Sequence, residues 1–287
     1  MYWIVTESTC DFPKAYVDAQ DHFYLMHMTY TMDGKIYTPD GTDANAREIY
    51  AHMRAGKMLS TSQINTDEWA KCFESILSQG NDVLAIVFSS GLSGTYMSAV
   101  AAAEELRPKY PERKLELIDS LCASAGEGLL VHYALENRKN GMTLAENAHW
   151  VRANVQNLIH WFTVDDLHFL RRGGRLSAAS AYLGSLLLIK PVLHVDHEGH
   201  LIPMEKVQGR RRSLRALCDK LKKYAVNPEE QTVFISHGDC LEDAEYLAEL
   251  LKKEAHVKQV EISYVGPIIG AHSGPGTVAL FFLGNGR

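Results

Sequence analysis

The stretch Val83-Leu-Ala-Ile-Val-Phe88 is an uncharged apolar run that leads directly into Ser89-Ser-Gly-Leu-Ser-Gly-Thr95. A helical pattern continues from Thr95 to Leu106, and Pro108 ends it. A short buried strand that runs through a polar turn into a helix is typical of a βαβ unit in a mostly parallel sheet. This segment therefore predicts an α/β fold.

The same order of elements recurs in the first half of the chain. Trp3-Ile-Val5 leads into a polar segment, and Leu115 to Ile118 leads into Asp119-Ser120. Another helix is expected after Gln63, because Asn65 and the glutamate three residues later have the spacing of a capping box. Its apolar residues recur at helical spacing, as Trp69, Phe73, Ile76 and Leu77.

The pattern changes near residue 160. Val192 to His200 and Leu201 to Val207 predict two strands joined by a turn at 196–199. Amphipathic helices are expected around Leu214 and Leu247, with further strands at 233–235, 262–265 and 277–283. We therefore expect a parallel α/β domain over residues 1–160 and a mixed α/β domain over residues 161–287.

Length and composition narrow the class of protein. A chain of 287 residues corresponds to two domains of about 150 residues each. Its formal charge of −6 argues against a dedicated nucleic-acid binder. Five scattered cysteines without a Cys-x-x-Cys pair favour reduced thiols in the cytoplasm. The apolar stretch Leu176 to Ile189 is shorter than the ~20 residues that cross a bilayer.

Two hydroxyl-rich segments are candidates for an anion site. Ser60-Thr-Ser-Gln63 stands before the helix that Asn65 caps, and Ser89 to Thr95 follows a strand at the expected ligand-binding edge of the sheet. Free N–H groups at helix starts suit a carboxylate. The alternative is that these hydroxyls, including Ser93, only cap helices.

Two further segments carry charged or titratable groups. Arg171, Arg172 and Arg175 surround two glycines and can clamp a phosphate or carboxylate, although a solvated loop is the alternative. His272 lies within the glycine-rich segment 266–276, which we expect to be an exposed loop that presents an acid, a base or a phosphate donor. The remaining histidines form no convincing ligand set, so no metal is expected.

These segments, in this order, resemble the DegV family of fatty-acid-binding proteins, which includes the FakB-type subunits of bacterial fatty acid kinase. The similarity spans nearly the whole chain. The matching stretches are Thr6 to Pro13, Thr61-Ser-Gln63, Ser89 to Thr95, Ile118-Asp-Ser120, Leu170 to Leu176, Ile189-Lys-Pro191 and Gly266 to Gly276. Two positions depart from the common family pattern, with Glu7 where aspartate is frequent and Ile64 where proline is frequent.

The resemblance implies a three-layer α/β/α first domain, a smaller two-layer second domain and an internal tunnel for a long-chain fatty acid such as palmitate, stearate or oleate. The carboxylate would be held by the segments of Thr61, Ser62, Ser93 and Gly94. Arg171 and His272 would lie at the tunnel mouth, where a separate kinase subunit delivers phosphate to form an acyl phosphate. No cofactor and only transient membrane contact are implied.

Two other functions stay open at this point. Ser93 could be the nucleophile of an acyl or phosphoryl hydrolase or transferase with His272 as base, although no nucleophile elbow surrounds Ser93. Alternatively, the basic run from Arg210 to Arg215 could bind nucleic acid, with an affinity that falls steeply as salt rises.

Overall fold

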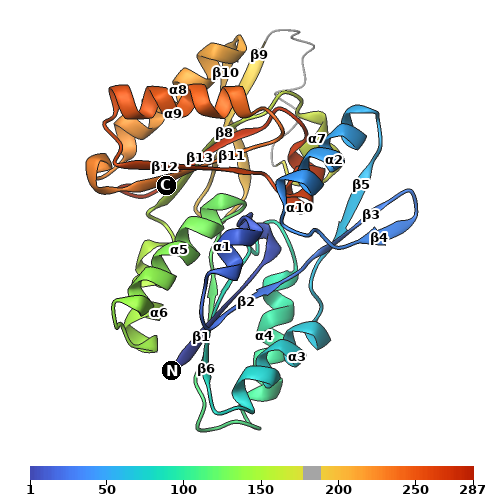
Figure 1. The fold of residues 1–287 in the computed structure, drawn as a ribbon, viewed down its shortest axis with the longest axis vertical. Helices are drawn as coiled ribbons and strands as arrows, with labels where there is room; N and C mark the ends of the chain where they lie inside the picture. Colours follow the sequence, from blue (N-terminus) through green and yellow to red (C-terminus); the bar gives the residue numbers. More distant parts are fainter. Residues whose placement is uncertain (177–188) are drawn as a thin grey trace.

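The computed structural model describes residues 1–176 and 189–287 (Figure 1). Its first sheet has the order β2-β1-β6-β7, and all its strand pairs are parallel. The strands are β1 (Tyr2–Glu7), β2 (Phe23–Met26), β6 (Asp82–Val87) and β7 (Leu115–Asp119). β6 is buried along nearly its whole length, as its uncharged sequence predicts, so the parallel α/β prediction is confirmed.

Helices cover both faces of this sheet. α3 (Thr66–Leu77) and α4 (Thr95–Leu106) lie on one side, and α5 (Ala125–Lys139) and α6 (Leu144–Asn154) lie on the other (Figure 1). The predicted capping box of α3 is present: Asn65 Oδ1 accepts from the Glu68 N–H at 3.0 Å, and Glu68 Oε2 accepts from the Asn65 N–H at 2.8 Å. The apolar stripe that begins at Trp69 is buried.

The second sheet is mixed, with the order β10-β9-β8-β13-β11-β12. Among the strands of this sheet that the structure describes, only β11 and β12 pair in parallel. The strands are β8 (Leu158–Thr163), β9 (Ile189–Val195), β10 (Leu201–Gln208), β11 (Thr232–His237), β12 (Gln259–Tyr264) and β13 (Val278–Leu283). The predicted hairpin is confirmed as the antiparallel pair β9 and β10. The expected domain boundary at 160 falls inside β8, which belongs entirely to this sheet.

The two sheets share α5. α8 (Arg210–Tyr224) and α9 (Leu241–Glu254) cover one face of the second sheet, while α5 contacts β8, β11 and β13 from the other. α5 also contacts β1 and β6 of the first sheet, so it is a layer common to both domains (Figure 1). Its buried small residues Gly126 and Gly128 allow this close packing on both sides.

A small third sheet was not predicted. It has the order β4-β3-β5 and is antiparallel, with β3 (Thr29–Met32), β4 (Lys35–Tyr37) and β5 (Leu59–Ser62). The residues expected as a polar turn before α3 are therefore mostly strand. The hydroxyls of β5 do not cap α3, because Asn65 does.

Six further helical elements complete the described chain. They are η1 (Ser8–Cys10), α1 (Lys14–Asp18), α2 (Asp43–Arg54), α7 (His168–Arg172), η3 (Pro228–Glu230) and α10 (Pro267–Ser273). The prediction of an exposed loop over 266–276 was wrong, because α10 occupies most of it and packs against α2, α7 and β5. Pro267 is well suited to the first turn of this helix, where its missing N–H is not needed.

No helix in residues 1–176 or 189–287 is long and apolar enough to cross a membrane. Most of the apolar stretch from Leu176 to Ile189 lies outside the described residues.

Candidate fatty-acid site

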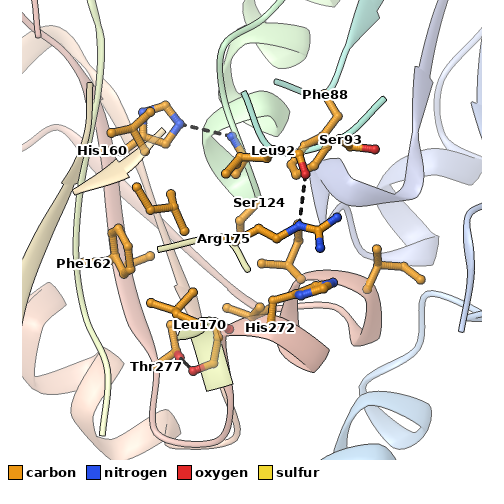
Figure 2. Close-up of a pocket in the computed structure, with 18 of the residues that line it drawn as sticks. Phe88, Leu92, Ser93, Ser124, His160, Phe162, Leu170, Arg175, His272 and Thr277 are labelled. Atoms are coloured by element: carbon orange, nitrogen blue, oxygen red, sulfur yellow. Dashed lines mark hydrogen bonds between the residues drawn. The ribbon is translucent and has the colours of Figure 1, made fainter. Parts of the chain in front are cut away.

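A cavity of about 300 Å³ lies between the two domains. Its walls are mainly apolar and come from both, including Met28, Phe88 and Leu92 from the first domain and Phe162, Leu201 and Ile268 from the second. Its polar side chains include Ser93, Arg175 and His272, which lie on one side in Figure 2, with His160 and Phe162 on the other. An apolar cavity with a few placed polar groups suits a ligand that is polar at one end.

Thr61 reaches this cavity because of its place in β5. Side chains alternate between the two faces of a strand, so Leu59 and Thr61 share the inward face while Ser60 and Ser62 share the outward one. Thr61 Oγ1 lies 2.8 Å from His272 Nε2. Ser62 is exposed and does not line the cavity. The structure thus brings together Thr61 and His272, which are far apart in the sequence.

The turn after β6 positions Ser93. The Ser93 side chain lines the cavity, and its Oγ accepts from the Thr95 N–H at 3.3 Å. Gly94 is exposed at the start of α4, and a Cβ there would lie 2.6 Å from Gln63 Oε1. Gly94 therefore offers backbone only, and its lack of a side chain makes room for Gln63, which also lines the cavity.

The same turn is tied to the second domain. Ser89 Oγ donates to the Gly199 carbonyl oxygen at 3.0 Å. A Cβ on Gly91 would lie 2.6 Å from the Glu198 carbonyl oxygen, so the two backbones approach closely there. The hairpin turn between β9 and β10 thereby supports the loop that carries Ser93.

Of the three arginines near residue 173, Arg175 is the one that lines the cavity. Its Nε donates to the Leu92 carbonyl oxygen at 3.1 Å, and its Nη1 donates to the Gly173 carbonyl oxygen at 2.5 Å. Arg171 and Arg172 are exposed on α7 and do not line this cavity. The family resemblance singled out Arg171 as a residue at the tunnel mouth, and that role stays a prediction. The spacing of the three arginines does not show which side chain lines the cavity.

His272 is held in a half-buried position on α10. The pKa of its imidazole is lowered to about 4, first by burial and then by the positive charges of Arg175 and Arg172. The ring is therefore neutral near pH 7. Its Nδ1 lies against Gly173, where a Cβ would collide with it, and has no hydrogen-bond partner among the described residues.

Three carboxyl groups of the first domain are buried, those of Glu7, Asp11 and Glu127. Glu7 Oε1 accepts from the Phe88 N–H at 2.8 Å, Glu127 accepts from Thr6 and Thr9 at 2.9 Å each, and Asp11 Oδ2 accepts from Ser124 Oγ at 2.5 Å. Burial raises the pKa of all three, to about 8 for Glu7 and about 7 for Asp11. Glu7 thus anchors the end of β6.

Sequence reasoning also missed Ser124, which lines the cavity from the position before α5, and His160, which lines it from β8. Ser124 stands where β7 runs into α5, and the same strand-to-helix argument that selected Ser93 could have found it. His160 gave no signal, because a histidine in an apolar strand reads as an ordinary core residue. The described residues contain no cluster of three or more His, Cys, Asp or Glu side chains that could hold a metal ion.

Comparisons with known proteins agree with this architecture. A family model described as "Uncharacterised protein, DegV family" matches residues 2–285. A DegV domain-containing protein of Clostridium perfringens, CPE0026, is 44% identical over 283 residues, covering 98% of this chain and 97% of that protein.

Solved structures give the same family. A DegV family protein of Thermus thermophilus, described as fatty acid binding, has a TM-score of 0.88 and 26% identity, with 99% of both chains covered. A fatty acid binding DegV family protein of Streptococcus agalactiae, SAG1342, has a TM-score of 0.86 and 28% identity, again with 99% of both chains covered. The chain therefore belongs to the DegV family.

Proposed function

We propose that this protein binds a long-chain fatty acid in the cavity between its domains, with the carboxylate held by Thr61 and Ser93. The observation that carries this proposal is the hydroxyl of Thr61, paired with a neutral His272 at one side of a mainly apolar cavity. Fatty-acid binding by similar DegV structures supports it. Palmitate, stearate and oleate are suitable ligands.

The chemistry of the cavity suits such a ligand. Each buried methylene stabilises the complex by about 0.8 kcal/mol, so a long chain supplies most of the affinity. When His272 Nε2 donates to Thr61 Oγ1, the Thr61 hydroxyl proton stays available to the carboxylate. Arg175 adds a positive charge beside the same cavity. The head group is thus oriented by neutral hydroxyls near one cation.

The protein would act as a cytoplasmic carrier that presents the bound acid to a separate kinase subunit, which forms the acyl phosphate. Arg171 and Arg172 are exposed on α7, which packs against the helix α10 that carries His272, and they offer that subunit a positive surface. Contact with membranes would be transient, during loading and release. No catalytic group of this chain is needed for that role.

Two alternative functions are less well supported by the geometry. The hydroxyl that pairs with His272 is that of Thr61, so Ser93 lacks the base that a Ser93 hydrolase needs. In the basic run, Arg210 pairs with Asp243, Arg211 stacks over Tyr246 and Arg215 pairs with Glu254, so these cations already have partners on the protein.

The experiment is solvent extraction of the purified protein followed by mass spectrometry, with calorimetric titration of added oleate into delipidated protein. We expect a co-purified long-chain fatty acid and saturable binding. Absence of lipid together with no binding of oleate would refute the proposal. Adding a fatty acid kinase subunit and ATP tests the carrier role separately, with acyl phosphate as the readout.

A further inference from the structure

Ser124 has an unusual backbone conformation. It lies between β7 and the first residue of α5, with φ of 55° and ψ of −148°. This region of φ and ψ is populated almost only by glycine, so a serine there is strained. The nucleophilic serine of α/β-hydrolases likewise has a strained backbone just before a helix, although there the strand leads directly into the turn, whereas here residues 120–123 separate β7 from Ser124.

Tight packing maintains this strain. A Cβ on Gly126 would collide with His160 Nε2, and a Cβ on Gly128 would lie 2.5 Å from the Cys10 carbonyl oxygen. The start of α5 is thus pressed between β8 of the second domain and the segment after β1. The turn at Ser124 cannot relax unless one of these contacts opens.

The Ser124 hydroxyl has a buried carboxyl group as its partner. Ser124 Oγ donates to Asp11 Oδ2 at 2.5 Å and lies 2.9 Å from Ser236 Oγ. When Ser236 donates to Ser124, one lone pair of Ser124 Oγ stays free. Burial raises the pKa of Asp11 to about 7, which is the range in which a general base works best.

Ser124 is also a lining residue of the cavity. It lines the same cavity as Thr61 and Ser93 and is drawn between His160 and Arg175 in Figure 2. At the start of α5, the Gly126 N–H donates to the Ala123 carbonyl oxygen at 3.1 Å and the Gly128 N–H donates to the Ser124 carbonyl oxygen at 3.2 Å, so these bonds hold the turn at Ser124 in place. A strained serine, a partner carboxyl and an acyl-sized apolar cavity therefore meet at one place.

We propose that Ser124, with Asp11 as its base, hydrolyses activated long-chain acyl esters or thioesters whose chain enters this cavity, and leaves the free fatty acid bound. The inference rests on the proposed function, because the substrate chain occupies the same cavity as the fatty acid. It differs from a Ser93 hydrolase in both the nucleophile and the base.

The reaction has two steps. In the first, Ser124 Oγ forms a bond to the acyl carbonyl carbon, the bond from that carbon to the leaving oxygen or sulfur breaks, and the serine proton passes through Asp11 to the leaving group. In the second, water attacks the acyl-serine and gives a proton to Asp11, which returns it to Ser124 as the acyl–Oγ bond breaks. The net reaction converts an ester and water into a fatty acid and an alcohol or thiol.

The test uses the full chain with p-nitrophenyl decanoate as substrate and a dodecyl fluorophosphonate as a covalent probe. Wild-type protein should release p-nitrophenol and carry the probe on the peptide that contains Ser124. Ser124→Ala and Ser124→Gly should be unlabelled and at least 100-fold slower, and Asp11→Asn should be about 100-fold slower. Ser75→Ala, on the exposed side of α3, is the matched control and should behave as wild type.

Ser124→Gly is the control for loss of activity through misfolding, because glycine adopts the positive φ at this position without strain. Absence of the probe from Ser124 in wild-type protein, or a Ser124→Gly rate equal to wild type, would overturn the inference. Oleate titration of the same samples separates the two proposals. Protein that binds oleate without cleaving the ester contradicts only the hydrolase, whereas protein that binds no oleate contradicts the fatty-acid site as well.

Discussion

Replacing Thr61 with valine removes one hydroxyl and keeps the shape of the side chain. Thr61 Oγ1 bonds to His272 Nε2 at 2.8 Å in the described structure, so the free protein loses one neutral hydrogen bond, about 1 kcal/mol of stability. The complex loses in addition the bond to the carboxylate, about 1.5–3 kcal/mol for a charged partner. At 1.4 kcal/mol for each factor of ten, the dissociation constant for oleate should rise about 10- to 150-fold.

The matched control is Ser62→Ala. Ser62 is the next residue of the same strand, carries the same kind of hydroxyl and is exposed on the opposite face. The oleate affinity of the Ser62→Ala variant should stay within about twofold of wild type, since substitutions at the surface usually have small energetic effects. The assay is calorimetric titration below the critical micelle concentration, with circular dichroism to verify folding. Equal affinities of Thr61→Val and wild type, or an equal loss in Ser62→Ala, would refute the assignment.

Three further predictions concern charge, pH and packing. Arg175→Gln should weaken oleate binding at least tenfold, whereas the exposed Arg171→Gln should leave it unchanged in the same titration. The pKa of Glu7 is raised to about 8 from 4.5, mainly by burial, so the folded state binds a proton that the unfolded chain has already released. Stability should therefore fall as pH rises from about 5 to 8, and urea unfolding of Glu7→Gln should show a smaller fall; an unchanged slope would contradict this. Gly91→Ala forces a Cβ to within 2.6 Å of the Glu198 carbonyl oxygen. It should therefore lower the free energy of unfolding by about 1–3 kcal/mol in the same assay and weaken oleate binding. A variant as stable as wild type would disprove that contact.

Local sequence patterns predicted the elements whose partners lie nearby in the chain. The uncharged run of β6, the capping box of α3 and the hairpin of β9 and β10 each depend on residues a few positions apart. The segment around Ser89 to Thr95 could also be assigned to the binding edge of the sheet, because strand direction fixes where that turn lies.

The errors came from segments whose conformation depends on distant contacts. β5 is a strand because β3 pairs with it, and residues 60–63 read by themselves are a polar turn. α10 is buried because α2, α7 and β5 pack around it, although its glycines and prolines suggest a loop. Such segments have weak local preferences, so tertiary contacts decide their structure.

Local patterns in the sequence thus predicted the two kinds of sheet, the helices α3, α4, α8 and α9, and four segments that contribute to the site. Which side chains meet depends on the tertiary packing: Thr61 lies beside His272, Arg175 rather than Arg171 lines the cavity, and Ser124 bonds to Asp11. The physical reason is that propensity and periodicity act within one segment, whereas a binding site consists of side chains from several segments. The directions in which these side chains point follow from the register of β5 and the packing of α5 and α10. No single segment encodes that register or that packing.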